Sequence, residues 1–290
     1  MLKWLGKCIL CALLGFWIPN VFSQAHYPAG VEGIKCATLP SPGLYTRVYT
    51  VFYTGSEFDD GPPWFNRTDV VVFVPRLIWI SDWKLFGANY GMDVLVPMGY
   101  VDVDHPPAGL GRSSGWSMGD TQLGLVLLGW HFEGLDIAAG YALWVPMGSY
   151  HDVCDLGKGF WGHMVTLGTT FYPDQEKAWA ISVLNRYELN HEHRDLDVTP
   201  GHVWTVEWGV SRVVKPGMEL GGVGYFQWQT TGDSGSQAVD VHEQVMGLGP
   251  ELVVQVKPIG VMLSLRYNYE LLAHGRTEGH NFTLTLTKRL

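Results

Sequence analysis

Charged side chains are scarce in this chain of 290 residues, in which Asp, Glu, Lys and Arg together make up 16%. Soluble domains usually carry about a quarter of their residues as charged side chains, so this surface is short of charge. The formal net charge is −9, and Lys and Arg form no cluster along the chain. Because nucleic-acid binding depends on clustered basic residues, we expect no nucleic-acid partner.

Long hydrophobic runs are also missing, apart from one at the start. Lys3 and Lys7 precede an apolar stretch at 9–18, which is shorter than the ~20 residues of a membrane-spanning helix. Small residues follow at Ser23 and Ala25. This pattern is typical of a secretory signal peptide, and we predict one over 1–25 with cleavage after Ser23 or Ala25.

Cysteine is rare as well. Cys8 and Cys11 lie in the predicted signal peptide, which leaves Cys36 and Cys154 in the remaining chain. Two cysteines form no disulfide framework of the kind that holds small secreted domains. The sequence leaves their pairing open, and two unpaired thiols are the simpler expectation.

Glycine and aromatic residues are abundant, with 36 Gly, 13 Trp, 13 Tyr and 12 Phe, a composition that favours strands and turns. About twelve strand-length segments follow one another, each long enough to cross a membrane at a tilt. They lie near 43–54, 69–81, 86–98, 119–131, 135–147, 161–173, 177–190, 201–212, 217–231, 241–257, 259–273 and 279–290.

Several segments alternate between apolar and polar side chains. In 177–190, Trp179 and Ile181 share one face, whereas Arg186 and Glu188 share the other. The last segment alternates in the same way: Phe282, Leu284 and Leu286 are expected to face lipid, and Thr283, Thr285 and Thr287 to face a lumen. Successive side chains of a strand point to opposite faces, so each segment has one apolar and one polar side.

The connections alternate between long and short. In chain order they are 55–68, 82–85, 99–118, 132–134, 148–160, 174–176, 191–200, 213–216, 232–240, a break at Lys257-Pro258, and 274–278. Outer-membrane barrels place short turns on the periplasmic side and long loops outside, whereas a soluble sandwich has no reason to do so. We therefore predict an all-β fold, a closed antiparallel transmembrane β-barrel of about 12 strands over 43–290, in a Gram-negative outer membrane. Its last strand would pair with its first.

Tryptophan occurs near the ends of the predicted strands, where an aromatic girdle would lie at the membrane interface. The residues concerned are Trp79, Trp83, Trp116, Trp130, Trp144, Trp161, Trp179, Trp204 and Trp228.

Several stretches resemble an exported family of outer-membrane transporters that is associated with the meta-cleavage pathway of phenol degradation. They are HYPAGVEGIKCATLPSPGLY (26–45), ANYGMDVLVPMG (88–99), LNRYE (184–188), DVTPGHVWTVEWGVSR (197–212), GLGPEL (247–252) and the terminal LTLTKRL. The resemblance spans nearly all of the chain after the signal peptide. It implies a membrane barrel and supplies no catalytic or binding residues.

Charged and aromatic side chains on the polar faces are the candidate functional residues. An Arg that faced lipid near the bilayer midplane would cost about 2–4 kcal/mol, so these side chains are expected in the lumen. They could form a structural network or line a path for solutes. The candidates are Arg47, Tyr49, Tyr53, Arg76, Asp93, Arg186, Glu188, Glu207, Arg266 and Glu270.

Residues 26–42 precede the first predicted strand and end in Pro40-Ser41-Pro42, which disfavours a regular strand. They form either a loose periplasmic tail or a plug inside the barrel. We favour the plug by analogy with hydrocarbon-uptake barrels.

Other chemistry finds little support in the sequence. His191, Glu192, His193, Asp195 and Asp197 resemble metal ligands, but a charged outer loop explains them better, and no metal or cofactor is expected. His131 or His202 could serve a Ser-His-Asp triad of a lipid-modifying enzyme, although no motif singles them out. We therefore expect no enzyme.

The function we predict is passive uptake of small hydrophobic or aromatic compounds through an outer-membrane channel. The expected partners are outer-membrane lipids and lipopolysaccharide, the barrel assembly machinery and the small hydrophobic solutes. The alternatives are an outer-membrane lipid-modifying enzyme and a structural or adhesive barrel that works through its loops.

Overall fold

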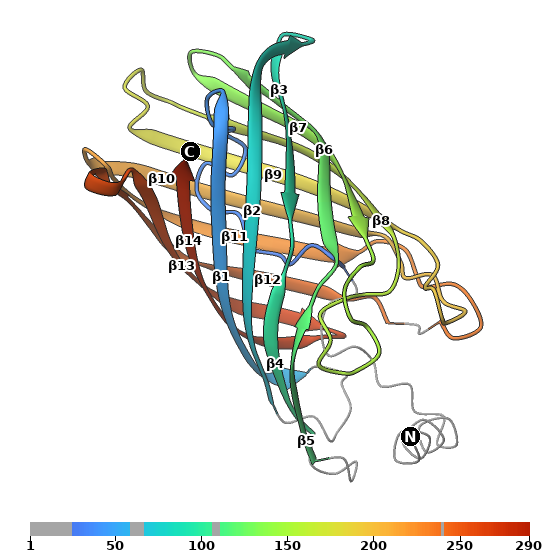
Figure 1. The fold of residues 1–290 in the computed structure, drawn as a ribbon. Helices are drawn as coiled ribbons and strands as arrows, with labels where there is room; N and C mark the ends of the chain where they lie inside the picture. Colours follow the sequence, from blue (N-terminus) through green and yellow to red (C-terminus); the bar gives the residue numbers. More distant parts are fainter. Residues whose placement is uncertain (1–24, 59–66, 106–110, 239–240) are drawn as a thin grey trace.

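The computed structural model describes residues 25–58, 67–105, 111–238 and 241–290. Most of this chain forms strands of a single antiparallel sheet that is closed on itself (Figure 1). Within those residues, no helix has the length and apolar character that a membrane-crossing helix requires. β1 (Gly43–Phe58) pairs on one side with β14 (Thr277–Arg289) and on the other with β2 (Arg67–Leu85), which closes the barrel. The predicted pairing of the last strand with the first is confirmed.

The remaining elements follow in chain order. They are β3 (Ala88–Leu95), β4 (Met98–His105), β5 (Gly111–Met118), β6 (Thr121–His131), β7 (Leu135–Val145), β8 (Gly162–Phe171), β9 (Trp179–Asn190), β10 (Val203–Lys215), β11 (Met218–Gln229), β12 (Gln244–Val256), the 3-10 turn η2 (Lys257–Ile259) and β13 (Val261–His274).

Two of the wall strands are interrupted. β2 pairs with β3 along one half of its length and with β4 along the other, so β3 and β4 are halves of one strand. β5 and β6 are related in the same way, since β5 pairs with β4 and β6 with β3. The sheet of fourteen segments is therefore a barrel of twelve strands, as the sequence predicted. Pro97, which has no N–H to donate, lies at the first interruption.

The prediction of a long loop at 99–118 was wrong. β4 and β5 occupy most of it and extend the barrel wall as a hairpin. Glycine and serine in this stretch conceal the strand pattern, because they bring neither bulk nor β-propensity. Among the described residues, β4 is the only strand that pairs with β5. The other edge of β5 contacts the loop 146–161, where the Ser149 N–H donates to the Met118 carbonyl.

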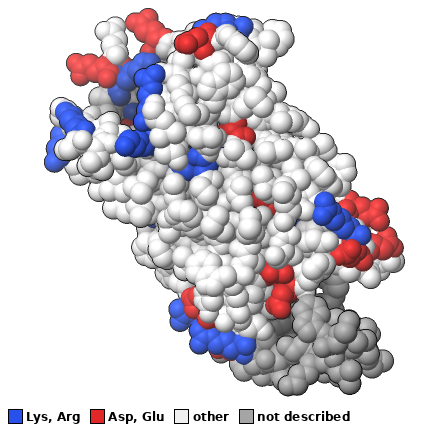
Figure 2. Space-filling model, in the orientation of Figure 1, with Lys and Arg blue, Asp and Glu red and all other residues white. Residues whose placement is uncertain are grey.

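The two faces of the wall differ as the alternation predicted. Outward-facing side chains are large, apolar and exposed, among them Phe52, Leu167, Ile181 and Phe282. The charged residues visible on one face of the molecule gather mainly at its two ends, and the wide band between them holds only a few isolated charged side chains (Figure 2). Such a band is what the hydrocarbon core of a bilayer requires.

The predicted aromatic girdle needs one correction. Trp79, Trp83, Trp116, Trp161, Trp179 and Trp204 are exposed, as residues at a membrane interface would be. Trp144 is 2% exposed, because β7 turns its side chain into the lumen, where it stacks on His26.

The short connections 86–87, 132–134, 172–178, 216–217 and 257–260 lie at the end of the barrel where β1 begins and β14 ends. The loops 146–161, 191–202 and 230–243 lie at the opposite end, together with the tight turn 275–276. By the rule for outer-membrane barrels, the short-turn end faces the periplasm and the long-loop end faces outward.

Candidate functional site

Residues 25–42, here called the N-terminal segment, lie against the inner wall of the barrel. His26 contacts Glu188 near the long-loop end, and Lys35 pairs with Glu219 near the short-turn end. The segment thus runs along the lumen before the chain enters β1. Its backbone N–H groups are held by carboxylates of the wall: those of Tyr27, Glu32 and Ile34 donate to Glu188, Glu207 and Glu251.

Glycines on the inner wall make room for the N-terminal segment. A Cβ added at Gly209 would lie 3.1 Å from the Cα of Ile34, and one added at Gly168 would lie 2.8 Å from the Cβ of Ala37. Gly129 faces Leu39 in the same way. Part of the high glycine content therefore serves a close approach of two backbones inside a narrow barrel.

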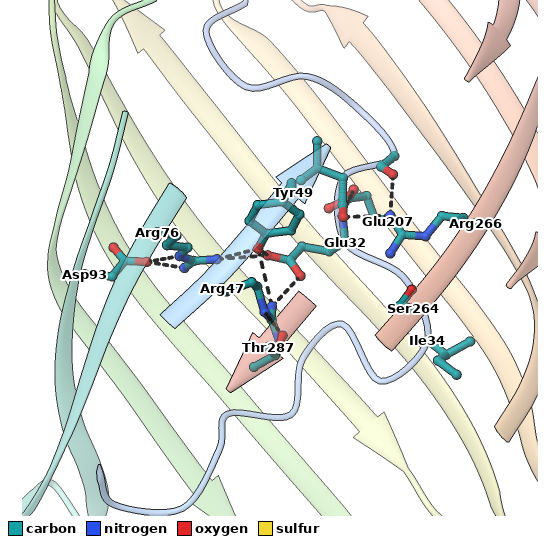
Figure 3. Close-up of polar contacts among 12 residues, drawn as sticks. Glu32, Ile34, Arg47, Tyr49, Arg76, Asp93, Glu207, Ser264, Arg266 and Thr287 are labelled. Atoms are coloured by element: carbon teal, nitrogen blue, oxygen red, sulfur yellow. Dashed lines mark hydrogen bonds and ion pairs between the residues drawn. The ribbon is translucent and has the colours of Figure 1, made fainter. Parts of the chain in front are cut away.

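Glu32 of the N-terminal segment is the centre of the polar network in mid-lumen (Figure 3). Its Oε1 accepts hydrogen bonds from Arg76 Nη1 and the Tyr49 hydroxyl, both at 3.0 Å, and its Oε2 accepts from Arg47 Nη1 at 3.1 Å. Burial acts to raise the pKa of Glu32, but the charges of Arg47, Arg76 and Arg186 outweigh it and lower that pKa to about 2. The carboxylate therefore stays ionised at any physiological pH.

Three of the arginines around Glu32 also have a carboxylate partner on the wall. Arg76 pairs with Asp93, and Arg186 Nη1 donates to Glu207 Oε2 at 2.6 Å. Arg266 pairs with Glu251 and donates to the carbonyls of Gly30 and Val31 at 2.6 Å. The four arginines Arg47, Arg76, Arg186 and Arg266 thus face the four carboxylates Glu32, Asp93, Glu207 and Glu251. The network has no net formal charge.

Two smaller polar groups lie nearer the long-loop end. In one, Glu270 accepts from the hydroxyls of Tyr53 and Tyr225 and lies 3.7 Å from Arg276 Nη2. In the other, His26 lies between Glu188, at 2.8 Å from its Nδ1, and Asp120, at 3.3 Å from its Nε2. Asp120 stands at the interruption between β5 and β6.

All ten candidates predicted from the sequence point into the lumen, distributed over these three groups. Sequence reasoning missed five of their partners: Glu32, Asp120, Tyr225, Glu251 and Arg276. Glu32 lies in a segment with no periodicity, Asp120 at a strand break and Arg276 in a turn, so alternation could not find them. Tyr225 and Glu251 lie on the inner faces of β11 and β12, so the alternation of those strands could have predicted them.

A mostly apolar cavity of about 210 Å³, here called the upper cavity, lies on the outward side of the Glu32 network. Val51 of β1 and Val70, Val72 and Val74 of β2 form one wall. The N-terminal segment contributes Tyr27, Pro28, Ala29 and Val31, and the loop 146–161 contributes Leu156 and Lys158. An engineered apolar cavity of about 150 Å³ accepts benzene, so this one has room for a single aromatic ring.

A second cavity of about 400 Å³, with a similar balance of polar and apolar surface, lies on the periplasmic side of the network and is here called the lower cavity. Arg47, Glu219, Glu251, Arg266 and Thr287 are among the residues that line it. Val31, Glu32 and Tyr49 line both cavities. These three residues therefore form the partition between the two cavities.

Most other groups singled out from the sequence lie in loops or near strand ends. Within the described ranges, no cluster of three or more His, Cys, Asp or Glu is arranged to hold a metal ion. His193 and Asp195 instead contact one another and His151 in the loops. His131 pairs with Asp136, which accepts from the Tyr172 hydroxyl, and His202 packs edge-on against Tyr187. Cys36 and Cys154 are not bonded to each other.

Comparison with known proteins places this architecture among bacterial outer-membrane barrels. An outer membrane channel from Pseudomonas putida F1 superposes with a TM-score of 0.76 at 16% identity, covering 91% of this chain and 99% of that one. The beta domain of the Bordetella autotransporter Brka gives a TM-score of 0.51 at 12% identity, covering 87% and 100%. No curated protein matches the sequence. These likenesses show the fold, and the apolar band of the outer surface assigns the barrel to the outer membrane.

The sequence itself matches one family over 58–286, which is most of its length. That match agrees with the resemblance found in the quoted stretches. The chain belongs to the family described as "Putative MetA-pathway of phenol degradation".

Proposed function

We propose that this barrel carries small, neutral, poorly water-soluble aromatic molecules passively across the outer membrane. The observation that carries the proposal is the valine wall of the upper cavity. The inner face of a transmembrane barrel is normally polar because it meets water. Val51, Val70, Val72 and Val74 instead give β1 and β2 an apolar inner face as well as an apolar outer one.

The polar groups at the borders of the upper cavity suit a phenol-like solute. Binding sites for such molecules combine apolar walls with a few oriented polar groups. Tyr49 and Tyr53 line this cavity and take part in the polar groups at its two ends. The family description, which refers to phenol degradation, supports the same class of solute.

The partition of Val31, Glu32 and Tyr49 makes the path a gated one. A shift of the N-terminal segment near Glu32 would let a solute pass from the upper cavity to the lower cavity. The network around Glu32 has no net formal charge, so a neutral ring meets a smaller barrier there than a hydrated ion. Passage requires a concentration gradient maintained by later metabolism and no catalytic step by the barrel.

The test compares a double and a single substitution in a strain that lacks the chromosomal gene. Val72→Thr with Val74→Thr places hydroxyls in the upper cavity at nearly unchanged volume, and Val253→Thr places one in the lower cavity as a control. Uptake of labelled phenol and toluene is measured at low concentration. The double variant should slow toluene more than phenol, and the control variant should slow neither.

The opposite pattern would point to a different transporter. If cells without the protein took up every aromatic solute at the parental rate but took up small hydrophilic solutes more slowly, the barrel would be a narrow general porin.

A further inference from the structure

The beginning of the N-terminal segment is held in a buried acidic site. The Glu188 side chain is 3% exposed, and its Oε1 accepts from both the backbone N–H and Nδ1 of His26, at 2.8 Å each. Glu188 Oε2 accepts from the Tyr27 N–H at 3.2 Å. The Asp120 carboxylate, 2% exposed, lies on the other side of the same imidazole. Two carboxylates thus converge on the backbone and ring of one residue.

The positive charges near this site are shared among several carboxylates. Lys158 interacts electrostatically with Glu243, Asp120 and Glu188 together. Arg276 is paired with Glu270. Burial acts to lower the pKa of His26, but hydrogen bonds to Asp120 and Glu188 outweigh it and raise that pKa. A protonated His26 and Lys158 together supply two positive charges to the three carboxylates Asp120, Glu188 and Glu243, and a buried charge without a counter-charge is strongly destabilising.

The path of the chain points to a further source of positive charge. His26 lies toward the long-loop end of the lumen, whereas β1 begins at the short-turn end. A leader still joined to His26 or Ala25 would have to be threaded outward through the lumen, although export leaders are removed on the inner side of the periplasm. The leader must therefore be cut off before the segment takes up this position.

We propose that the mature chain begins at His26 and that its α-ammonium group is bound by Glu188, with Asp120 beside it. Signal peptidase hydrolyses the Ala25–His26 peptide bond with one water molecule, which leaves a carboxylate on Ala25 and an ammonium on His26. The nitrogen that lies 2.8 Å from Glu188 Oε1 then carries a full charge and two further donors. Of the two cleavage points that the sequence allows, after Ser23 and after Ala25, only the second creates this ion pair.

Because of this site, the N-terminal segment is held fully in the lumen only after the leader before His26 has been removed. Stacking of His26 on Trp144 and its edge contact with Phe160 position the residue from both sides. Gly162 makes room for the His26 ring, because a Cβ at this position would lie 2.9 Å from His26 Nδ1. A mature chain with extra residues before His26 would have to place them in the upper cavity and would lose the ammonium at Glu188.

The first experiment is an intact-mass measurement on the wild-type protein extracted from outer membranes. A mass that matches residues 26–290 supports the proposal, and a mass that includes Gln24-Ala25 overturns it. The second experiment labels the α-amine by reductive dimethylation at pH 7 in detergent, before and after unfolding. The native α-amine should react at least tenfold more slowly than the unfolded one, and equal rates would overturn the proposal.

Two variants test whether slow labelling of the α-amine is caused by the ion pair with Glu188. Glu188→Gln preserves the shape of the side chain and removes its charge, and Glu219→Gln, which removes the partner of Lys35, is the matched control. In folded protein, Glu188→Gln should raise the labelling rate of the α-amine several-fold, and Glu219→Gln should leave it unchanged. Equal effects of both variants would count against the site. None of these readouts depends on the solute that the barrel carries.

Discussion

Glu32 is the residue on which the partition between the two cavities depends most directly. Replacing it by Gln leaves Arg47, Arg76 and Arg186 with one carboxylate fewer, so the network acquires one net positive charge. We expect Glu32→Gln to raise single-channel conductance and to make the residual current anion-selective. Planar-bilayer recordings with a salt gradient measure both quantities. Glu192→Gln, in the exposed part of the loop 191–202, serves as the control, and identical reversal potentials for Glu32→Gln and wild type would contradict the role of Glu32.

The pH dependence of the same group follows from its pKa of about 2. The folded-state pKa lies below the ordinary value of 4.5, so the carboxylate stabilises the folded arrangement above that ordinary value and loses this contribution only as pH falls toward 2. Conductance should therefore remain constant between pH 7 and pH 4. A rise in conductance near pH 5 would show that a different group controls the partition.

Cys36 reports whether the N-terminal segment stays in the lumen. Burial raises the pKa of its thiol to about 12, so the reactive thiolate is nearly absent at pH 8. In a Cys154→Ser background, we expect a maleimide reagent to label Cys36 slowly in folded protein and rapidly after unfolding. Rapid labelling of folded protein would mean that the segment leaves the barrel spontaneously.

At the scale of elements, the N-terminal segment and the glycine-lined wall act as one packed unit. Gly209→Ala places a methyl group 3.1 Å from the Ile34 Cα, and overpacking of this kind typically costs about 1–3 kcal/mol. We expect this variant to have a lower thermal unfolding temperature and noisier channel currents. Gly222→Ala is a control with nothing within 4 Å of the added carbon, and it should match wild type.

At the scale of the whole molecule, closure of β1 on β14 leaves a barrel that should resist unfolding in detergent. Unheated protein is expected to migrate differently from boiled protein on a denaturing gel. The Glu32→Gln and Glu188→Gln variants should show the same shift, since the wall pairing does not depend on either residue. Loss of the shift would mean that the N-terminal segment is needed for the barrel itself.

The sequence was most informative where alternation is regular. The faces of β9, β10, β13 and β14 could be predicted because each strand has one apolar and one polar face. Prediction failed where local pattern is weak: the β4–β5 hairpin is rich in Gly and Ser, and Trp144 looks like an interfacial residue until His26 is placed beside it. The valine wall was also missed, because Val70, Val72 and Val74 stand in a stretch that is apolar on both faces.

The balance of four arginines and four carboxylates around the N-terminal segment has a consequence for the permeability barrier of the cell. An ion entering the partition would shed its hydration shell and find every fixed charge already neutralised, whereas an uncharged ring has little hydration to lose. High copy number should therefore not make the envelope leaky to charged antibiotics or dyes. A bacterium could enrich its surface in this protein while it feeds on an aromatic solute and keep its resistance to ionic toxins.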